Sequence, residues 1–221
     1  MKFLKREWFT LLIVILSIGA GVVFYHILPD TIPTHWNING VADSYGPKVP
    51  AVLLMIGTML FIVVIFMLAP LLDKRAVTGE NESVWKTIRN IILLFFFLLQ
   101  CVLFILISAG VTSGFSAVFL WFIGLLFVVL GFYMPKMKQN GIMGIRVSWT
   151  MKSEKVWDAS HRFGGKVFMG AGVLAILGGF ISISNPIAGA IIGILGPLPF
   201  LLIVVLVYPY LLSRKEESDL P

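Results

Sequence analysis

Long apolar runs separated by short polar segments dominate this chain. Six of these runs contain no Asp, Glu, Lys or Arg, and they cover residues 9–28, 52–72, 91–110, 115–134, 167–183 and 188–212. A helix needs roughly 20 consecutive apolar residues to cross the hydrocarbon core of a bilayer. Each run is close to that length. The pattern therefore predicts an all-α fold, a polytopic six-transmembrane helix bundle.

The composition supports a membrane protein and excludes several soluble classes. Hydrophobic residues make up 58% of the 221 residues, charged residues make up 13%, and the mean hydropathy is +0.97. A soluble domain carries about 25% charged residues. A soluble enzyme and a nucleic-acid-binding domain are therefore poor interpretations. A disulfide scaffold is excluded as well, because Cys101 is the only cysteine in the chain.

The placement of the basic residues predicts the orientation. Of the 17 Lys and Arg residues, all but Lys48 fall in the N-terminal segment, in 73–90, in 135–166 or in the C-terminal tail. Loops rich in Lys and Arg remain on the cytoplasmic side. We therefore expect a multi-pass protein of the bacterial cell membrane with both termini in the cytoplasm, N-in and C-in. The net charge of +6 is then a topology signal, and we expect no direct binding of nucleic acid.

The first run is interpreted as a retained span. Its apolar stretch of about 20 residues exceeds the 7–15 of a signal peptide, and no small-x-small cleavage site follows it.

Two polar segments are long enough to carry specific function. The extracellular loop 29–50 is stiffened by Pro29 and Pro33 and contains the turn dipeptide Asn39-Gly40 and the aromatic residues Trp36 and Tyr45, so we expect an ordered cap. This cap is either a structural lid on the bundle or a surface that meets an extracellular ligand.

The cytoplasmic loop 135–166 is the second of these segments. Ser153 followed by Glu154 is typical of a helix start, and Gly164 and Gly165 can end or bend that helix. Because basic residues outnumber acidic ones here, we expect an amphipathic cytoplasmic helix on the anionic inner leaflet. A docking surface for a cytoplasmic partner is the alternative. Residues 73–90 are interpreted as a cytoplasmic linker.

Signatures of catalysis and metal binding are weak. The three histidines form no His-Glu-x-x-His pair. His35 with Asp43 or Asp30 supplies only two ligands of a metal site. No span contains a carboxylate that an intramembrane aspartyl protease would need. We therefore predict no catalytic residues, no metal and no cofactor.

Two alternatives to a binding protein stay open. One is an intramembrane or interfacial hydrolase or metalloenzyme that uses His35, Asp43 or His161. The other is a peptide exporter, with Gln100 lining a cavity between the spans.

The two polar segments resemble a known family. In the cytoplasmic loop, the residues that resemble the signature of the SdpI family are Asn140-Gly141, Gly144-Ile145-Arg146, Trp149-Thr150, Ser153-Glu154, Trp157 and His161-Arg162-Phe163-Gly164. The extracellular loop is similar to a hairpin of unknown function found in full-length members. The residues that carry this second likeness are Ile32-Pro33, His35-Trp36-Asn37, Gly40, Asp43, Tyr45 and Lys48.

The resemblance implies a bacterial immunity protein. The family is named for immunity to a secreted sporulation-delaying peptide toxin, and its namesake also holds a cytoplasmic transcriptional repressor at the membrane. Residues 1–72 would then form an N-terminal transmembrane hairpin, and 91–221 a four-span SdpI-like region. The toxin-facing candidates are His35, Trp36, Asn37, Asp43 and Tyr45. The partner-binding candidates are Arg146, Trp149, Glu154, Trp157, His161 and Arg162.

Overall fold

Helices form almost the whole molecule. A computed structural model describes residues 2–37 and 39–218, with side chains from Glu7 onward. Five long helices are α1 (Lys2–Ile27), α2 (Lys48–Leu72), α3 (Asn81–Ser108), α4 (Phe115–Tyr133) and α6 (Glu154–Ser182). With the helical segment Pro186–Ser218, the described residues contain six helices long and apolar enough to cross a membrane. The prediction of an all-α, six-span bundle is confirmed.

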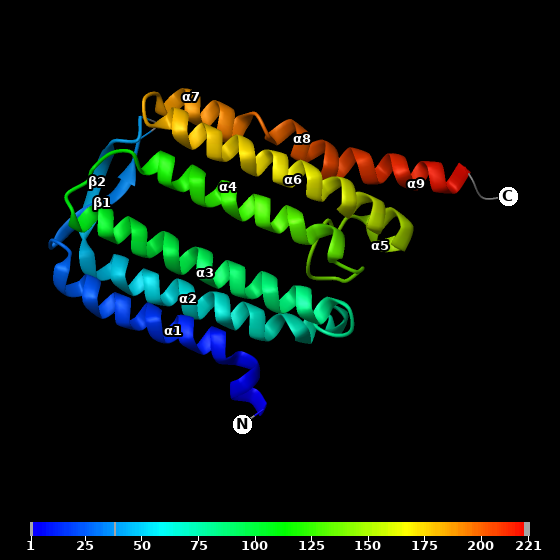
Figure 1. The fold of residues 1–221 in the computed structure, drawn as a ribbon, viewed down its shortest axis with the longest axis horizontal. Helices are drawn as coiled ribbons and strands as arrows, with labels where there is room; N and C mark the ends of the chain where they lie inside the picture. Colours follow the sequence, from blue (N-terminus) through cyan, green and yellow to red (C-terminus); the bar gives the residue numbers. More distant parts are fainter. Residues whose placement is uncertain (1, 38, 219–221) are drawn as a thin grey trace.

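The spans form two groups that run along the same long axis. In Figure 1, α1, α2 and α3 lie together, and α4 lies with α6 and the last span. Within the second group, the backbones of α4 and α6 approach each other very closely. An added Cβ at Gly172 would lie 2.5 Å from the Gly124 carbonyl oxygen, and one at Gly131 would lie 2.6 Å from that of Gly165. Small residues let helix backbones approach in this way.

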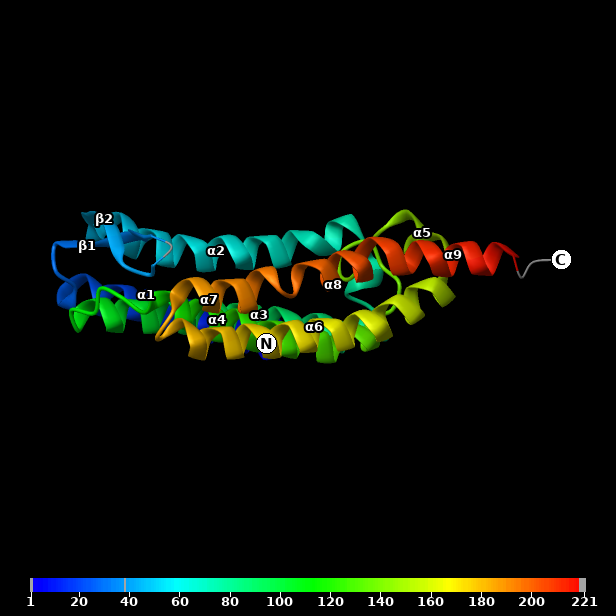
Figure 2. The ribbon, with the colours of Figure 1, turned by 90° about the horizontal axis from the view of Figure 1, so that it is seen from above.

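The last span is interrupted. It consists of α7 (Pro186–Ala190), a π-helical turn (Ile191–Leu195), α8 (Leu198–Leu202), a second π-helical turn (Ile203–Val207) and α9 (Tyr208–Ser218). Pro197 and Pro199 lack the backbone N–H that a continuous helix requires. Figure 2 shows the resulting break before α8.

The loop after α1 forms a β-hairpin. Strands β1 (Thr31–Trp36) and β2 (Ala42–Pro47) pair antiparallel, with bulges on both sides of His35. Ile32 is buried in a core that includes residues of α1, α2, α3 and α4. The Ala42 N–H donates to the Thr112 carbonyl at 3.2 Å, which ties the hairpin to the α3–α4 turn. The expected ordered cap is therefore a two-stranded sheet, a minor addition to the helical fold.

Two helices extend further than expected. The start at Ser153 is confirmed, because its hydroxyl accepts from the Val156 N–H at 3.2 Å. Gly164 and Gly165 do not end the helix, however, and the expected amphipathic helix and the fifth span are one helix, α6. The expected linker is also shorter, because its residues from Asn81 onward are the first turns of α3. A 3-10 turn, Lys74–Ala76, remains in the connection.

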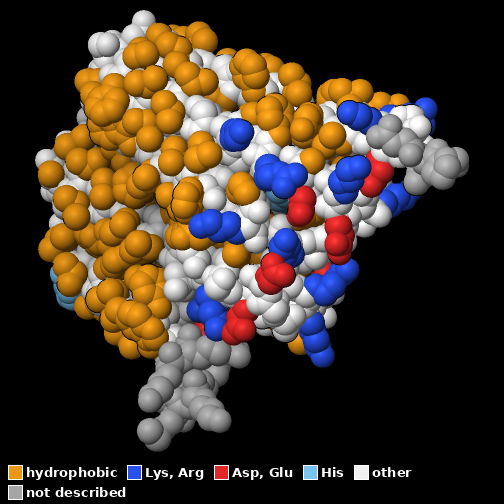
Figure 3. All heavy atoms as spheres, turned by 45° about the vertical axis from the view of Figure 1, so that its right-hand side comes forward, with side chains coloured by type: hydrophobic (Ala, Val, Ile, Leu, Met, Phe, Trp, Pro, Cys, Tyr) orange, Lys and Arg blue, Asp and Glu red, His pale blue; other side chains and the backbone are white. Residues whose placement is uncertain are grey.

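Charge gathers at one end of the bundle. Figure 3 shows Lys and Arg side chains gathered with acidic ones toward the right of the view, and mostly hydrophobic side chains toward the left. We call this the basic end, and we call the opposite end, which carries β1 and β2, the hairpin end. Many large apolar side chains along the spans are exposed. This surface suits lipid, and the chain is a multi-pass membrane protein.

Candidate functional site

The loop at residues 137–153, which we call the signature loop, folds around one buried side chain. Asn140 Oδ1 accepts from the backbone N–H groups of Ile142 at 2.9 Å and Met143 at 2.8 Å. Its Nδ2 donates to the Lys138 carbonyl at 2.8 Å. A buried amide needs partners for both its donors and its acceptor. Asn140 therefore fixes the turn that begins the loop.

The signature loop docks on the connection between α2 and α3. The Gly141 N–H donates to Asp73 Oδ2 at 2.7 Å, and the Lys138 N–H donates to Asn81 Oδ1 at 2.9 Å. The Arg75 guanidinium donates to both carboxylate oxygens of Asp73 and, with the backbone N–H bonds, lowers the pKa of that carboxyl to about 2. The two connections at this end thus form one folded unit.

His161 of α6 joins the signature loop to that helix through two hydrogen bonds, and we call this contact the histidine latch. His161 Nδ1 donates to the Trp157 carbonyl at 2.9 Å, and its Nε2 accepts from the Ile145 N–H at 3.0 Å. Because Nε2 must present a lone pair, the ring is neutral with its proton on Nδ1. The ring stacks on the Trp157 indole with a 4.0 Å centroid separation, and that indole N–H donates to the Met137 carbonyl at 2.7 Å. Gly144, at φ +100°, lies directly against the imidazole.

A threonine closes the other side of the loop, where the short helix α5 (Ser148–Lys152) begins. Thr150 Oγ1 donates to the Ile145 carbonyl at 2.6 Å and accepts from the Val147 N–H at 3.1 Å. Gln139 Nε2 donates to the Thr150 carbonyl at 2.7 Å. The backbone of the signature loop is therefore held by side chains from both of its ends.

The structure corrects part of the docking prediction at the basic end. Trp157 and His161 are fully buried, so they support the loop from inside and present no surface to a partner. Arg146, Glu154 and Arg162 are exposed. Trp149 is half-buried and lies edge-on to Tyr210, with a centroid separation of 5.3 Å. These four residues are the partner-binding candidates whose side chains reach the surface.

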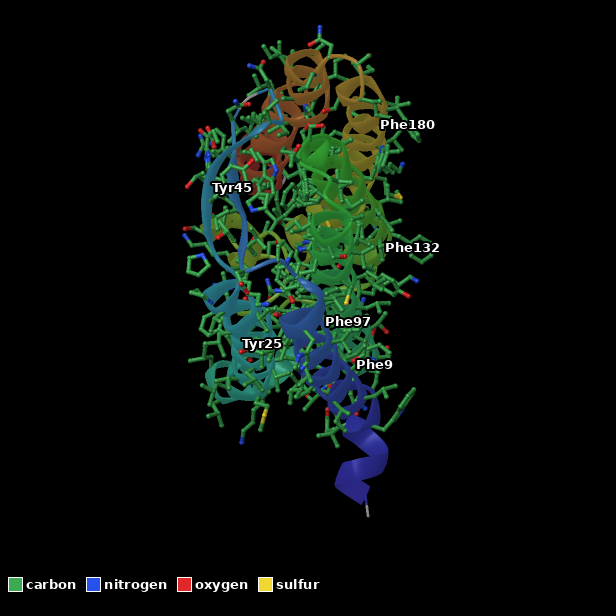
Figure 4. The ribbon with its side chains drawn as sticks, turned by 90° about the vertical axis from the view of Figure 1, so that its left-hand side faces the viewer. Phe9, Tyr25, Tyr45, Phe97, Phe132 and Phe180 are labelled. Atoms are coloured by element: carbon green, nitrogen blue, oxygen red, sulfur yellow. The ribbon has the colours of Figure 1, made fainter. Side chains whose placement is uncertain are left out.

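The hairpin end carries an exposed polar pair. His35 Nδ1 and Asp43 Oδ1 lie 2.6 Å apart, and their side chains are 69% and 42% exposed. Tyr45 is exposed on β2, and Figure 4 looks onto this end with Tyr45 labelled. Trp36 is half-buried, with its ring 4.4 Å from that of Phe115. His35, Asp43 and Tyr45 therefore place polar groups on the surface of the hairpin end, whereas Trp36 anchors the hairpin on the bundle.

Asn37, the remaining hairpin candidate, shapes the turn. Its Oδ1 accepts from the backbone N–H groups of Asn39 at 2.9 Å and Val41 at 3.2 Å. Asp30, considered above as a metal ligand, pairs with Lys48 at 3.2 Å. Within the described residues, no group of three or more His, Cys, Asp or Glu side chains is arranged to hold a metal ion.

An ion pair at the basic end was not predicted from the sequence. Arg89 of α3 pairs with Glu7 of α1 at 2.5 Å, and both side chains are nearly buried. They line a cavity of about 370 Å³ together with Thr10, whose buried hydroxyl has no hydrogen-bond partner among the described residues. The acidic Glu7 among basic neighbours was the only signal in the sequence. The pair connects the first span to the third.

Comparisons with known proteins cover both polar segments. Residues 136–212 match the model of the SdpI/YfhL protein family, and residues 12–60 match that of a domain of unknown function, DUF1648. The chain is 26% identical over 178 residues to a protein named Immunity protein SdpI from Bacillus subtilis (strain 168), across 80% of this chain and 83% of that protein. No solved structure matches. The first match contains the whole signature loop, and the second contains the hairpin.

Proposed function

The chain belongs to the SdpI family, and from this premise we propose that it is a membrane immunity protein that protects a bacterial cell against a secreted peptide toxin. The observation that carries the proposal is the likeness to Immunity protein SdpI over 80% of the chain. We propose that protection works by binding the toxin and not by catalysis.

The proposed topology places the two candidate surfaces on opposite sides of the membrane. The basic end would lie in the cytoplasm with both termini, because Lys and Arg remain on that side. The hairpin end, where Lys48 is the only basic residue of the loop after α1, would face outward. A toxin outside the cell and a partner inside it would then each meet an ordered part of this chain.

The toxin would meet the hairpin end. The exposed pair of His35 and Asp43 offers a donor and an acceptor, and Tyr45 offers an exposed ring with a hydroxyl. An amphipathic peptide that partitions into the membrane presents apolar and polar groups at the same depth. The polar groups of the hairpin and the apolar sides of the neighbouring spans match such a ligand.

A cytoplasmic transcriptional repressor would dock at the basic end. Its surface would be the exposed face of the signature loop and the start of α6, with Arg146, Trp149, Glu154 and Arg162. Trp157 and His161 would hold this surface in shape from below.

Survival of a toxin-sensitive strain tests the role of the hairpin. We expect the double variant His35→Ala/Asp43→Ala to lose protection against the toxin at unchanged abundance in the membrane. Thr34→Ala/Ser44→Ala is the matched control, since these two exposed residues form another cross-strand polar pair, with 3.4 Å between their hydroxyl oxygens. The control should protect as the wild type does. Full protection by the His35/Asp43 variant would remove the hairpin pair from the toxin-binding surface.

A second assay separates protection from signalling. Arg146→Ala should reduce toxin-dependent expression of a repressor-controlled reporter while survival stays at the wild-type level. Lys152→Ala removes an exposed positive charge from α5 and serves as the control. Equal loss of survival and reporter signal in Arg146→Ala would contradict separate surfaces for toxin and repressor.

A further inference from the structure

A groove opens on the side of the bundle at the basic end. Its volume is about 540 Å³, and it lies where α4, α6 and α9 meet. The residues that define its character are Phe132 of α4, Tyr208 of α9, and Arg162, Phe163, Lys166 and Met169 of α6. The four residues of α6 follow a spacing of one, three and three, which places them on one side of that helix, where it borders the groove.

The rim of the groove carries two cations that take part in no salt bridge among the described residues. Among the described residues, neither Arg162 nor Lys166 forms a salt bridge, whereas Arg75, Lys86 and Arg89 each pair with an acid. A third cation lies close by, since Lys136 Nζ is 4.1 Å from the centre of the Phe132 ring. The groove therefore favours an anionic group.

The walls of the groove are apolar and continuous with the surface that faces lipid. The exposed fractions of Phe132 and Phe163 are 54% and 38%. Figure 4 shows Phe132 of α4 and Phe180 of α6 projecting from the same side of the bundle. An apolar chain lying along this side would stay in contact with protein from the groove toward the middle of the spans.

The length of α6 places the two cations near the membrane surface. A helix rises about 1.5 Å per residue, so the 29 residues of α6 extend about 43 Å, beyond the roughly 30 Å of the hydrocarbon core. If Ser182 marks one boundary of the core, Arg162 lies about 30 Å away, at the opposite boundary. Lys166 lies one turn deeper, from where its long side chain can extend to the same level.

We propose that this groove is a binding site for one anionic phospholipid, with the headgroup phosphate held by Arg162 and Lys166. The Arg162 guanidinium can donate two parallel hydrogen bonds to phosphate oxygens, and Lys166 adds a point charge. The Tyr208 hydroxyl, which lines the same groove, supplies a further donor. One acyl chain lies against Phe132 and Phe163. A zwitterionic phosphatidylcholine headgroup carries its own cation and gains less from these side chains.

Native mass spectrometry of the purified full-length chain tests this site. The probes are phosphatidylglycerol, phosphatidylcholine, sodium phosphate and a short polyglutamate peptide. The wild type should retain phosphatidylglycerol about tenfold more tightly than phosphatidylcholine, which corresponds to about 1.4 kcal/mol. Arg162→Gln/Lys166→Gln should lose this preference. Lys152→Gln/Lys155→Gln is the control. It removes two positive charges from the same end but outside the groove, and it should keep the preference for phosphatidylglycerol.

A second variant tests the acyl chain independently of charge. Phe132→Ala should weaken retention of phosphatidylglycerol severalfold, and thermal unfolding of each variant checks that it is folded. Equal retention of phosphatidylglycerol by the two charge variants would overturn the proposal, as would wild-type retention by Phe132→Ala. Binding of sodium phosphate as tight as that of the lipid would indicate a free-phosphate site. Equally tight binding of polyglutamate would indicate an acidic protein partner, and either result would overturn the lipid assignment.

Discussion

The substitution Gly144→Ala tests the histidine latch directly. Gly144 lies at φ +100°, in the region of backbone space that favours glycine, and an added Cβ would overlap His161 Nε2. That nitrogen accepts the hydrogen bond from the Ile145 N–H. The alanine methyl group would force the imidazole and the loop backbone apart. It would leave a buried acceptor and a buried donor without partners.

The expected cost follows from these two effects. An unsatisfied buried polar group costs about 1–3 kcal/mol. A left-handed conformation costs a residue with a Cβ about 1–2 kcal/mol. We therefore expect the free energy of unfolding to fall by about 2–5 kcal/mol, a large share of the roughly 5–15 kcal/mol typical of folded proteins.

The assay is thermal unfolding of the purified chain at a fixed scan rate, followed by tryptophan fluorescence. Gly170→Ala is the matched control, because Gly170 lies on the same helix as His161 and a Cβ there meets nothing within 4 Å. The control should unfold at or slightly above the wild-type temperature, since alanine favours a helix by about 1 kcal/mol over glycine. An unfolding temperature for Gly144→Ala equal to that of Gly170→Ala would refute the latch.

Three further outcomes are expected from the same unfolding assay. Gly172→Ala should lower the unfolding temperature, because its Cβ would lie 2.5 Å from the Gly124 carbonyl oxygen and force α4 and α6 apart; an unchanged temperature would contradict the close packing. Arg89→Met should lower the free energy of unfolding, by at most about 3–5 kcal/mol, because it removes the guanidinium that pairs with the nearly buried Glu7 carboxylate. Adding Glu7→Gln should restore part of the loss; a double variant no more stable than Arg89→Met would contradict the pair. The stability that Asp73 adds, measured against Asp73→Asn, should be complete above about pH 5 and lost as the pH falls through about 2, because the pKa of its carboxyl is lowered to about 2 in the folded state; a difference between the two proteins that stays constant from pH 5 to pH 2 would contradict this linkage.

The spans could be predicted from the sequence because the bilayer sets a length that the apolar runs must meet. The start of α6 was also predictable, since a capping serine acts within one helical turn. The continuation of α6 past Gly164 and Gly165 was not. Whether a glycine ends a helix depends on what packs against it, and Gly165 packs against Gly131 of α4.

The candidate site was predictable in residue type and less so in exposure. Trp157 and His161 belong to the signature, but only the folded loop shows that they are buried beneath it. The connection from Asp73 to Gly141 and the pair of Glu7 and Arg89 link residues far apart in the chain. Periodicity within one segment carries no information about such contacts, which arise when the helix ends meet.

At the hairpin end, too, the pattern of residues predicted a local turn but not which side chains pair. Asn39-Gly40 predicted a turn, and Gly40 adopts φ +70°, a backbone conformation that favours glycine. The pairing of His35 with Asp43 depends on the bulges in β1 and β2, which shift the register around His35. The alternation of residues along either strand therefore does not predict that these two side chains pair.

Survival of a sensitive bacterium that expresses the full chain tests the immunity proposal most directly. The cells would be challenged with a panel of secreted bacterial peptide toxins that includes the sporulation-delaying peptide. The account predicts survival at toxin concentrations that kill cells carrying an empty vector, and loss of that survival in His35→Ala/Asp43→Ala. If the wild-type chain is present in the membrane and its cells die at the same concentration as the vector control for every toxin, the immunity proposal is wrong.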